Sequence, residues 1–251
     1  MLPAKFNHER SGPTVEAYLL GTVDFASCQA LQQRLVYEST GRQDGQIALL
    51  ICEHPGGISV GRQGSRAHIQ LSSRELESRR WDVRWVNRGG GCVVHGSGQL
   101  GVYAIVPLEW YGFSVGEYLK RLQSGILAAL AESRFVGQTH AGRLGVWGRN
   151  GQVVAFGSAV KSWVTYHGAF VNVTCPLQRF HGIETDPVEH SPMSSLLVER
   201  QQPVRMTAVR ESLVRHLSTA FDCERYHIYT GHPLLVRTLI PIAQESAARV
   251  G

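Results

Sequence analysis

The sequence has no apolar run that approaches the roughly 20 residues needed by a membrane-spanning helix, so we expect no membrane span. Its first residues, 1–10, are too polar for the apolar core of a secretory signal peptide. The 5 cysteines are an odd number and form no Cys-x-x-Cys pair, which indicates reduced thiols rather than a disulfide framework. Together these absences predict a cytoplasmic protein that does not bind a membrane.

Histidine is abundant but is not spaced for metal binding. None of the 11 histidines forms a His-x-His or His-x-x-x-His pair, so we expect no structural metal site, and we expect no cofactor. The net charge is +5 and the pI is about 9.1, yet the basic residues are scattered and are not interleaved with aromatic residues. This charge favours acidic protein partners over nucleic acid.

The chain is long enough for one large globular domain with at most a small appendage. It has 251 residues, of which 43% are hydrophobic and 18% are charged. The apolar spacing predicts helices over 24–40, 115–130 and 206–221, and the spacing Ser114-x-x-Glu117 predicts a capping box at the second helix. Ser72-x-x-Glu75 predicts a second capping box before a short helix, and residues 46–52 and 81–86 are typical of strands.

A hairpin turn is predicted where Arg149-Asn-Gly151 separates two pairs of apolar residues, because Asn-Gly accepts positive φ at both turn positions. This turn places Gln152 at the first residue of the returning strand. The next strand is expected to end at Asn172, and the polar, proline-containing stretch 186–195 is expected to form a surface loop.

The segment Arg88–Tyr103 is the most informative part of the chain, since six of its sixteen residues are glycine. Glycine lets the main chain approach a ligand closely, while Arg88 and His95 supply a charge and a titratable ring. A flexible connector is the alternative interpretation. The apolar residues 100–106 that follow argue against it, because binding loops are positioned by rigid scaffolds.

This segment resembles the motif RGGxxxxHGPGQxxxY of the lipoyl/octanoyl transferase branch of the biotin–lipoate protein ligase superfamily, with Ser97 in place of the usual proline. Residues from about 15 to 200 fall in register with that family. The other matching segments are Glu53-His-Pro55, Leu144-Gly-Val-Trp147, Gln152-Val-Val-Ala-Phe-Gly157, Trp163–Val173 and the LxxF pattern of Leu177–Phe180.

The resemblance implies a single α/β domain with a mixed, mostly antiparallel sheet flanked by helices, like the ligase catalytic domain. Residues 1–225 would form this octanoyltransferase-like domain, and 226–251 would be a C-terminal extension. The implied reaction moves an octanoyl (or lipoyl) group from acyl carrier protein to a lysine of a lipoyl domain, in protein lipoylation. The implied substrate-binding residues are Arg88, Gly89, Gly90, Gly91, Cys92, Val93, Val94, His95, Ala155, Phe156, Gly157, His167, Gly168 and Ala169.

Two positions depart from the family pattern. The family uses a cysteine that carries the acyl group and a lysine that activates this cysteine, and the matching positions here are Asp186 and Gln152. An aspartyl intermediate would be an anhydride, which is more reactive than the thioester it comes from. Lys161, on the same predicted strand and turn, is a candidate replacement cation, although a lysine at a strand end is commonly just solvated. Cys92 and Cys175 are candidate nucleophiles.

A route without a protein nucleophile is also open. The acceptor lysine can attack the bound thioester directly, because positioning alone lowers a barrier by about 7–11 kcal/mol when the geometry is good. His95 or His167 would then act as the general base, and the main-chain amides of residues 155–157 would receive the oxyanion. For His167 the alternative is a local role in satisfying backbone groups.

Two other functions stay open beside acyl transfer. The chain can be an inactive relative that still binds an acyl chain, an acyl carrier or a lipoyl domain. It can also be an ATP-dependent lipoate ligase, although the ligases of this superfamily use the same lysine that Gln152 replaces.

Overall fold

The computed structural model describes residues 13–42, 44–185 and 191–235. Its strands are β1 Thr14–Thr22, β2 Ile47–Glu53, β3 Gly57–Val60, β4 Asp82–Trp85, β5 Cys92–His95, β6 Gln99–Ile105, β7 Gln138–His140, β8 Arg143–Trp147, β9 Gln152–Lys161, β10 Val164–Asn172 and β11 Arg225–Thr230. Its helices are α1 Phe25–Gly41, α2 Ser73–Arg79, α3 Leu108–Tyr111, α4 Val115–Glu132, α5 Leu196–Arg200 and α6 Met206–Ala220, with short 3₁₀ helices η1 Arg66–His68 and η2 Leu177–Phe180.

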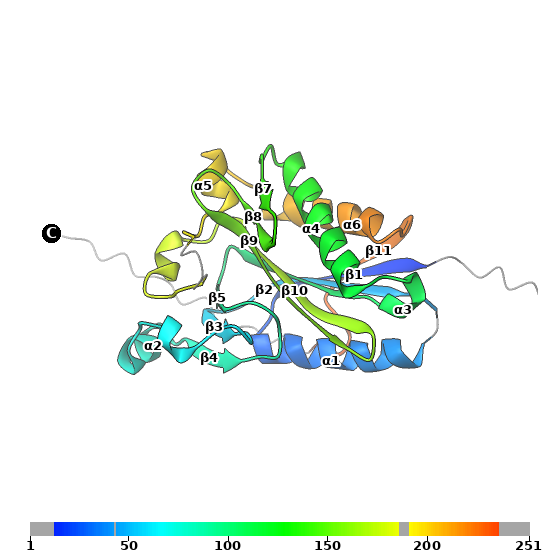
Figure 1. Cartoon of the computed structure of the whole chain (residues 1–251), viewed down its shortest axis with the longest axis horizontal. Coiled ribbons are helices and arrows are strands. Elements are labelled where there is room, and N and C mark those ends of the chain that lie inside the picture. Colours follow the sequence, from blue (N-terminus) through cyan, green and yellow to red (C-terminus); the bar gives the residue numbers. More distant parts are fainter. Residues whose placement is uncertain (1–12, 43, 186–190, 236–251) are drawn as a thin grey trace, which may run out of the picture.

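An eight-stranded sheet in the order β11-β1-β2-β6-β10-β9-β8-β7 forms the centre of the molecule. The pairs β11–β1 and β1–β2 are parallel, and the other neighbours in this sheet are antiparallel. A smaller sheet, β4-β3-β5, lies beside it and carries α2 at its outer side (Figure 1). The predicted mixed, mostly antiparallel sheet is confirmed.

Helices cover both faces of the large sheet, α1 on one and α4 with α6 on the other (Figure 1). The larger apolar core lies between the sheet and the pair α4 and α6, and it includes Leu122, Ile126, Leu213 and Leu217. A second core lies under α1, whose buried residues Cys28, Leu31, Leu35 and Val36 recur at helical spacing. Among the described residues, no helix combines the length and apolar character needed to cross a bilayer.

The helix starts predicted from capping residues are confirmed, with one difference. Ser72 and Glu75 form both halves of their capping box. The Ser114 hydroxyl accepts from the amide of Glu117, but the Glu117 carboxylate accepts from Arg121 at 2.7 Å instead of completing the box. A cation one turn away therefore takes the carboxylate from the helix start.

The hairpin turn between β8 and β9 is confirmed, but its predicted backbone is partly wrong. Gly151 has φ 145°, whereas Asn150 is not among the residues with positive φ. The reason is a distant carboxylate: Glu199 accepts from the amides of Arg149 at 2.8 Å and Asn150 at 3.0 Å. This contact holds the turn in a different form from the one local sequence favours.

The C-terminal part of the described chain continues the large sheet. β11 pairs in parallel with β1 through residues Thr14 to Leu19. The predicted boundary between 225 and 226 falls inside this strand, so residues up to Thr230 are part of the sheet. The division into a family domain and an extension stays a prediction.

Candidate active site

The glycine loop, residues 88–91, is held on both sides by backbone hydrogen bonds. The carbonyls of Arg88, Gly90 and Gly91 accept from the amides of residues 61–63 at 2.9–3.1 Å, and the Gly89 amide donates to the Ser158 carbonyl at 3.0 Å. A Cβ on Gly157 would lie 2.7 Å from the Gly89 carbonyl oxygen, so only glycine allows β9 to approach the loop this closely. The loop is a rigid element rather than a flexible connector.

Arg88 is fully buried beneath this loop. Its guanidinium donates to the carbonyl of Gly89 at 2.9 Å and to the carbonyl and hydroxyl of Ser59 at 2.8 Å. Its Nε has no partner among the described residues, and its charge lies 5.5 Å from the centre of the Phe170 ring. Burial lowers the pKa of Arg88 to about 10, so the residue keeps its positive charge at neutral pH.

His95, at the end of β5, has both ring nitrogens engaged within the protein. Nε2 lies 2.7 Å from the Ser59 hydroxyl and Nδ1 lies 3.2 Å from Oε1 of Gln99. Because Gln99 uses its amide nitrogen for Val94 and Asn172, its oxygen faces His95 and Nδ1 must be the donor. This clamp does not favour the predicted role of His95 as a general base.

His167, in β10, is the opposite case. Its φ is 57°, and its backbone amide donates to Oε1 of Gln32 on α1 at 2.8 Å. The ring is buried, and neither nitrogen has a partner among the described residues. The ring therefore makes no hydrogen bond to local backbone groups in the part of the chain that the structure describes.

Burial determines the charge of both rings. It lowers the pKa of His167 to about 3, with a further contribution from Arg88. It also lowers the pKa of His95 well below its usual value, helped by His54 and Arg88. Both imidazoles are neutral at physiological pH, and a neutral imidazole offers one N–H donor and one acceptor.

The two positions that depart from the family pattern are placed differently. Gln152 is buried at the start of β9, where its side-chain amide donates to the Val154 carbonyl at 3.1 Å. Asp186 lies outside the described residues. Lys161 is exposed at the other end of β9, about 30 Å from Gln152 at 3.3 Å per residue, so the structure does not bring the two together.

The two cysteines considered as nucleophiles are buried thiols. Burial raises the pKa of Cys92 above its usual value and raises that of Cys175 to about 12. A buried thiol with a raised pKa is a poor nucleophile, because the reactive species is the thiolate. Neither environment favours covalent catalysis.

A cavity of about 480 Å³ lies beside η2. Its lining comes from both sides of position 186, with Glu184 and Thr185 before it and residues 191–193 after it. The last stretch is tied to the start of β9, since the Gln152 amide donates to the Pro192 carbonyl at 2.8 Å. Arg88, His95 and His167 do not line this cavity.

Sequence reasoning missed several residues that position the site. Ser59 joins Arg88 to His95, Asn172 extends the Gln99 contact, and Gln32 holds the backbone of His167. Gln32 left a signal in the sequence, because it is a polar residue on the apolar face of α1. Ser59 and Asn172 left none, since their partners are distant in the chain.

The fold and the site formed by the glycine loop, Arg88, His95 and His167 are now compared with those of known protein families. The chain belongs to the lipoyl protein ligase A/B catalytic domain family, whose model matches residues 24–218. The predicted family resemblance is therefore confirmed.

Two curated relatives and one solved structure are similar to this chain over most of its length. An octanoyltransferase of Roseiflexus sp. (strain RS-1) is 32% identical over 84% of this chain and 89% of its own length. One from Syntrophotalea carbinolica is 30% identical over 90% of this chain and 96% of its own length. A crystal structure of lipoate-protein ligase A bound with ATP superimposes with a TM-score of 0.70 over 87% of this chain and 90% of that chain, at 12% identity, and this likeness concerns the fold alone.

Proposed function

We propose that this protein is an octanoyltransferase of protein lipoylation, which moves an octanoyl (or lipoyl) group from acyl carrier protein to a lysine of a lipoyl domain. The observation that carries the proposal is the similarity to curated octanoyltransferases over 84% and 90% of the chain. The two protein partners and a cytoplasmic location belong to the same proposal. The net charge of +5 supports it, because acyl carrier proteins and lipoyl domains are typically acidic.

The chemistry we propose is direct transfer. The lysine nitrogen attacks the thioester carbonyl carbon, the C–N bond forms, the C–S bond breaks, and the proton lost by nitrogen ends on the departing sulfur. His167 donates its ring N–H to the carbonyl oxygen as negative charge develops there. Its pKa of about 3 supports this role over that of general base, because such a weak base holds a proton poorly.

Arg88 and the glycine loop complete the arrangement. The buried charge of Arg88 adds a positive potential beside His167, and the rigid loop limits movement of the bound thioester. Residues 155–157 are paired with β10 in the sheet, so this proposal does not assign the oxyanion to their main-chain amides. The cavity beside η2 has a volume of about 480 Å³, within the range of about 300–1,000 Å³ typical of ligand sites, and it would hold part of the substrate.

The test is transfer without ATP. Purified protein is mixed with octanoyl-acyl carrier protein and a lipoyl domain, and mass spectrometry follows the octanoylated domain. Transfer supports the proposal. Turnover only with free octanoate and ATP, with release of pyrophosphate, would identify a ligase, and binding without turnover would identify an inactive relative.

Two variants and a search for an adduct test the mechanism. His167→Phe should lower the transfer rate about 10²–10³-fold, as loss of one oxyanion donor does, whereas His216→Gln on the surface of α6 should not change it. Quenched single-turnover samples should contain no acylated enzyme. An acyl group trapped on Asp186, Cys92 or Cys175 would refute direct transfer while leaving octanoyl transfer intact.

A further inference from the structure

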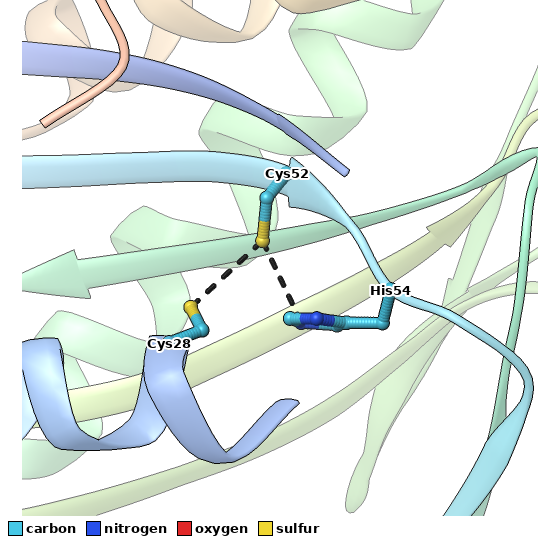
Figure 2. Close-up of side chains that lie close together, drawn as sticks. All are labelled: Cys28, Cys52 and His54. Carbon is cyan, nitrogen blue, oxygen red and sulfur yellow. Dashed lines mark hydrogen bonds between the residues drawn. The ribbon is translucent and has the colours of Figure 1, made fainter. Parts of the chain in front are cut away.

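Helix α1 and strand β2 bring two thiols and an imidazole together in the interior (Figure 2). Sγ of Cys28 lies 3.9 Å from Sγ of Cys52, and Sγ of Cys52 lies 3.5 Å from Nε2 of His54. All three ligand atoms lie within 4.8 Å of one another. The residues are 1%, 0% and 2% exposed, respectively.

We propose that Cys28, Cys52 and His54 form a binding site for Zn²⁺. In a tetrahedral zinc site the Zn–S bonds are about 2.3 Å and the Zn–N bonds about 2.0–2.1 Å, which places neighbouring sulfurs about 3.8 Å apart and sulfur and nitrogen about 3.6 Å apart. Two of the three separations, 3.9 Å and 3.5 Å, match these edges, and the third, between Sγ of Cys28 and Nε2 of His54, is at most 4.8 Å. Two thiolates with one imidazole are ligands that zinc prefers.

Hydrogen bonds from neighbouring groups orient two of the ligands. Nδ1 of His54 lies 2.7 Å from the carbonyl oxygen of Val23, so this nitrogen is the donor, and Nε2 carries the lone pair that would bind the metal. The side-chain amide of Gln32 donates to Sγ of Cys28 at 3.7 Å. Contacts of this kind fix the tautomer of a histidine ligand and stabilise a thiolate ligand.

The charge balance suits a buried site. Binding replaces two thiol protons with one Zn²⁺, so two thiolates neutralise the ion and two protons leave to solvent. A neutral complex carries a much smaller burial penalty than a free charge does.

Tyr103 is positioned to respond to the metal. Its hydroxyl lies 2.6 Å from Nε2 of His54, where it donates a hydrogen bond in the metal-free form. Zinc would take that lone pair and displace the hydroxyl, because neighbouring nitrogen and oxygen ligands of a tetrahedral zinc site lie about 3.4 Å apart rather than 2.6 Å. The site is also close to the candidate active site, because the rings of His54 and His95 are 5.6 Å apart and Gln32 contacts both Cys28 and His167.

The test uses Zn²⁺ and Co²⁺ as probes. Because the ligands are buried, the full chain is unfolded in denaturant with a chelator present, freed of the chelator, and then refolded with one equivalent of metal. We expect one bound Zn²⁺ per chain, a higher Tm than the chelated protein, and thiolate-to-cobalt charge-transfer absorption with Co²⁺. Less than a tenth of an equivalent of bound zinc, or a cobalt spectrum without a thiolate band, would overturn the proposal.

Variants locate the site. Cys28→Ala and Cys52→Ala should abolish stoichiometric binding, and His54→Gln should weaken it at least tenfold. Cys175→Ala and Cys223→Ala, which remove other buried thiols, should leave binding unchanged. Equal binding in Cys28→Ala and wild type would refute the assignment. If that variant fails to fold, the intensity of the cobalt charge-transfer band in wild type still decides, because it reports the number of thiolate ligands. None of these results depends on octanoyl transfer.

Discussion

Mild acid should destabilise this protein through its buried histidines. His54, His95 and His167 are each held neutral by burial, which lowers the pKa of His54 to about 4, that of His167 to about 3 and that of His95 well below its usual value. In the unfolded chain these rings titrate near 6.5. As the pH falls below 6.5, the unfolded state binds protons that the folded state does not, so the free energy of unfolding decreases.

The size of this loss follows from the pKa values of His54 and His167. Each histidine with a folded pKa of 4 or below contributes about 1.4 kcal/mol per pH unit below 6.5. Between pH 6.5 and pH 5, His54 and His167 together remove about 3 kcal/mol, because the unfolded rings are only half protonated at pH 6.5, and His95 adds to the loss in the same direction. A typical domain has a free energy of unfolding of about 5–15 kcal/mol, so this protein should lose a large part of its stability between pH 6.5 and pH 5.

Urea unfolding at pH 7, 6 and 5, followed by tryptophan fluorescence in the presence of a chelator, measures the loss. His167→Gln and His54→Gln should each flatten the pH dependence, because glutamine takes up no proton. The reasoning fails if the unfolding free energy of wild type is the same at pH 6.5 and pH 5. It also fails if both variants keep the wild-type slope.

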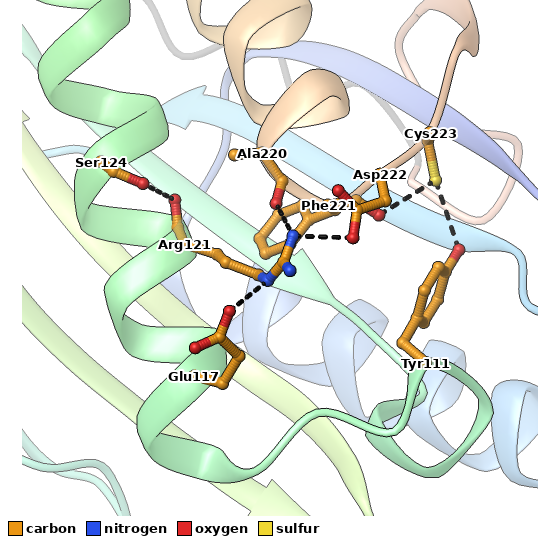
Figure 3. A network of polar contacts seen from close by, with 8 residues as sticks. All are labelled: Tyr111, Glu117, Arg121, Ser124, Ala220, Phe221, Asp222 and Cys223. Carbon is orange, nitrogen blue, oxygen red and sulfur yellow. Dashed lines mark hydrogen bonds and ion pairs between the residues drawn. The ribbon is translucent and has the colours of Figure 1, made fainter.

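Four substitutions, one of them a control, test other contacts of the fold. Gly98→Ala should lower the free energy of unfolding by more than about 2 kcal/mol, because φ is +85° and the new Cβ would lie 2.6 Å from a backbone nitrogen. Gly112→Ala, with open space around it, should lower it by about 1 kcal/mol. Equal losses in urea unfolding would contradict this. Glu199→Gln should speed hydrogen exchange at the β8–β9 turn, and unchanged protection there would be evidence against its role. Arg121→Met removes a contact between α4 and Asp222 (Figure 3) and should lower stability by about 1 kcal/mol or less in thermal unfolding, since the pair is partly exposed; a larger loss would mean the network matters more than its exposure indicates.

Local features of the fold were predictable from the sequence. The spacing of apolar residues located α1, α4 and α6, and Ser72 and Ser114 marked helix starts, because both signals depend on residues within one or two turns. The glycine content of residues 88–91 pointed to the loop, since a close approach of two backbones requires glycine.

The sequence by itself determined the family, the helices and the glycine loop, because each is written in short-range patterns of residue type. Only the tertiary structure decided the state of the functional side chains. It placed the ring of His95 against the Ser59 hydroxyl and left the ring of His167 without a partner among the described residues. It also brought the thiol of Cys28 on α1 to within 3.9 Å of the thiol of Cys52 on β2. The physical reason is that burial and distant partners determine charge and hydrogen bonding, and both arise only when remote segments pack together.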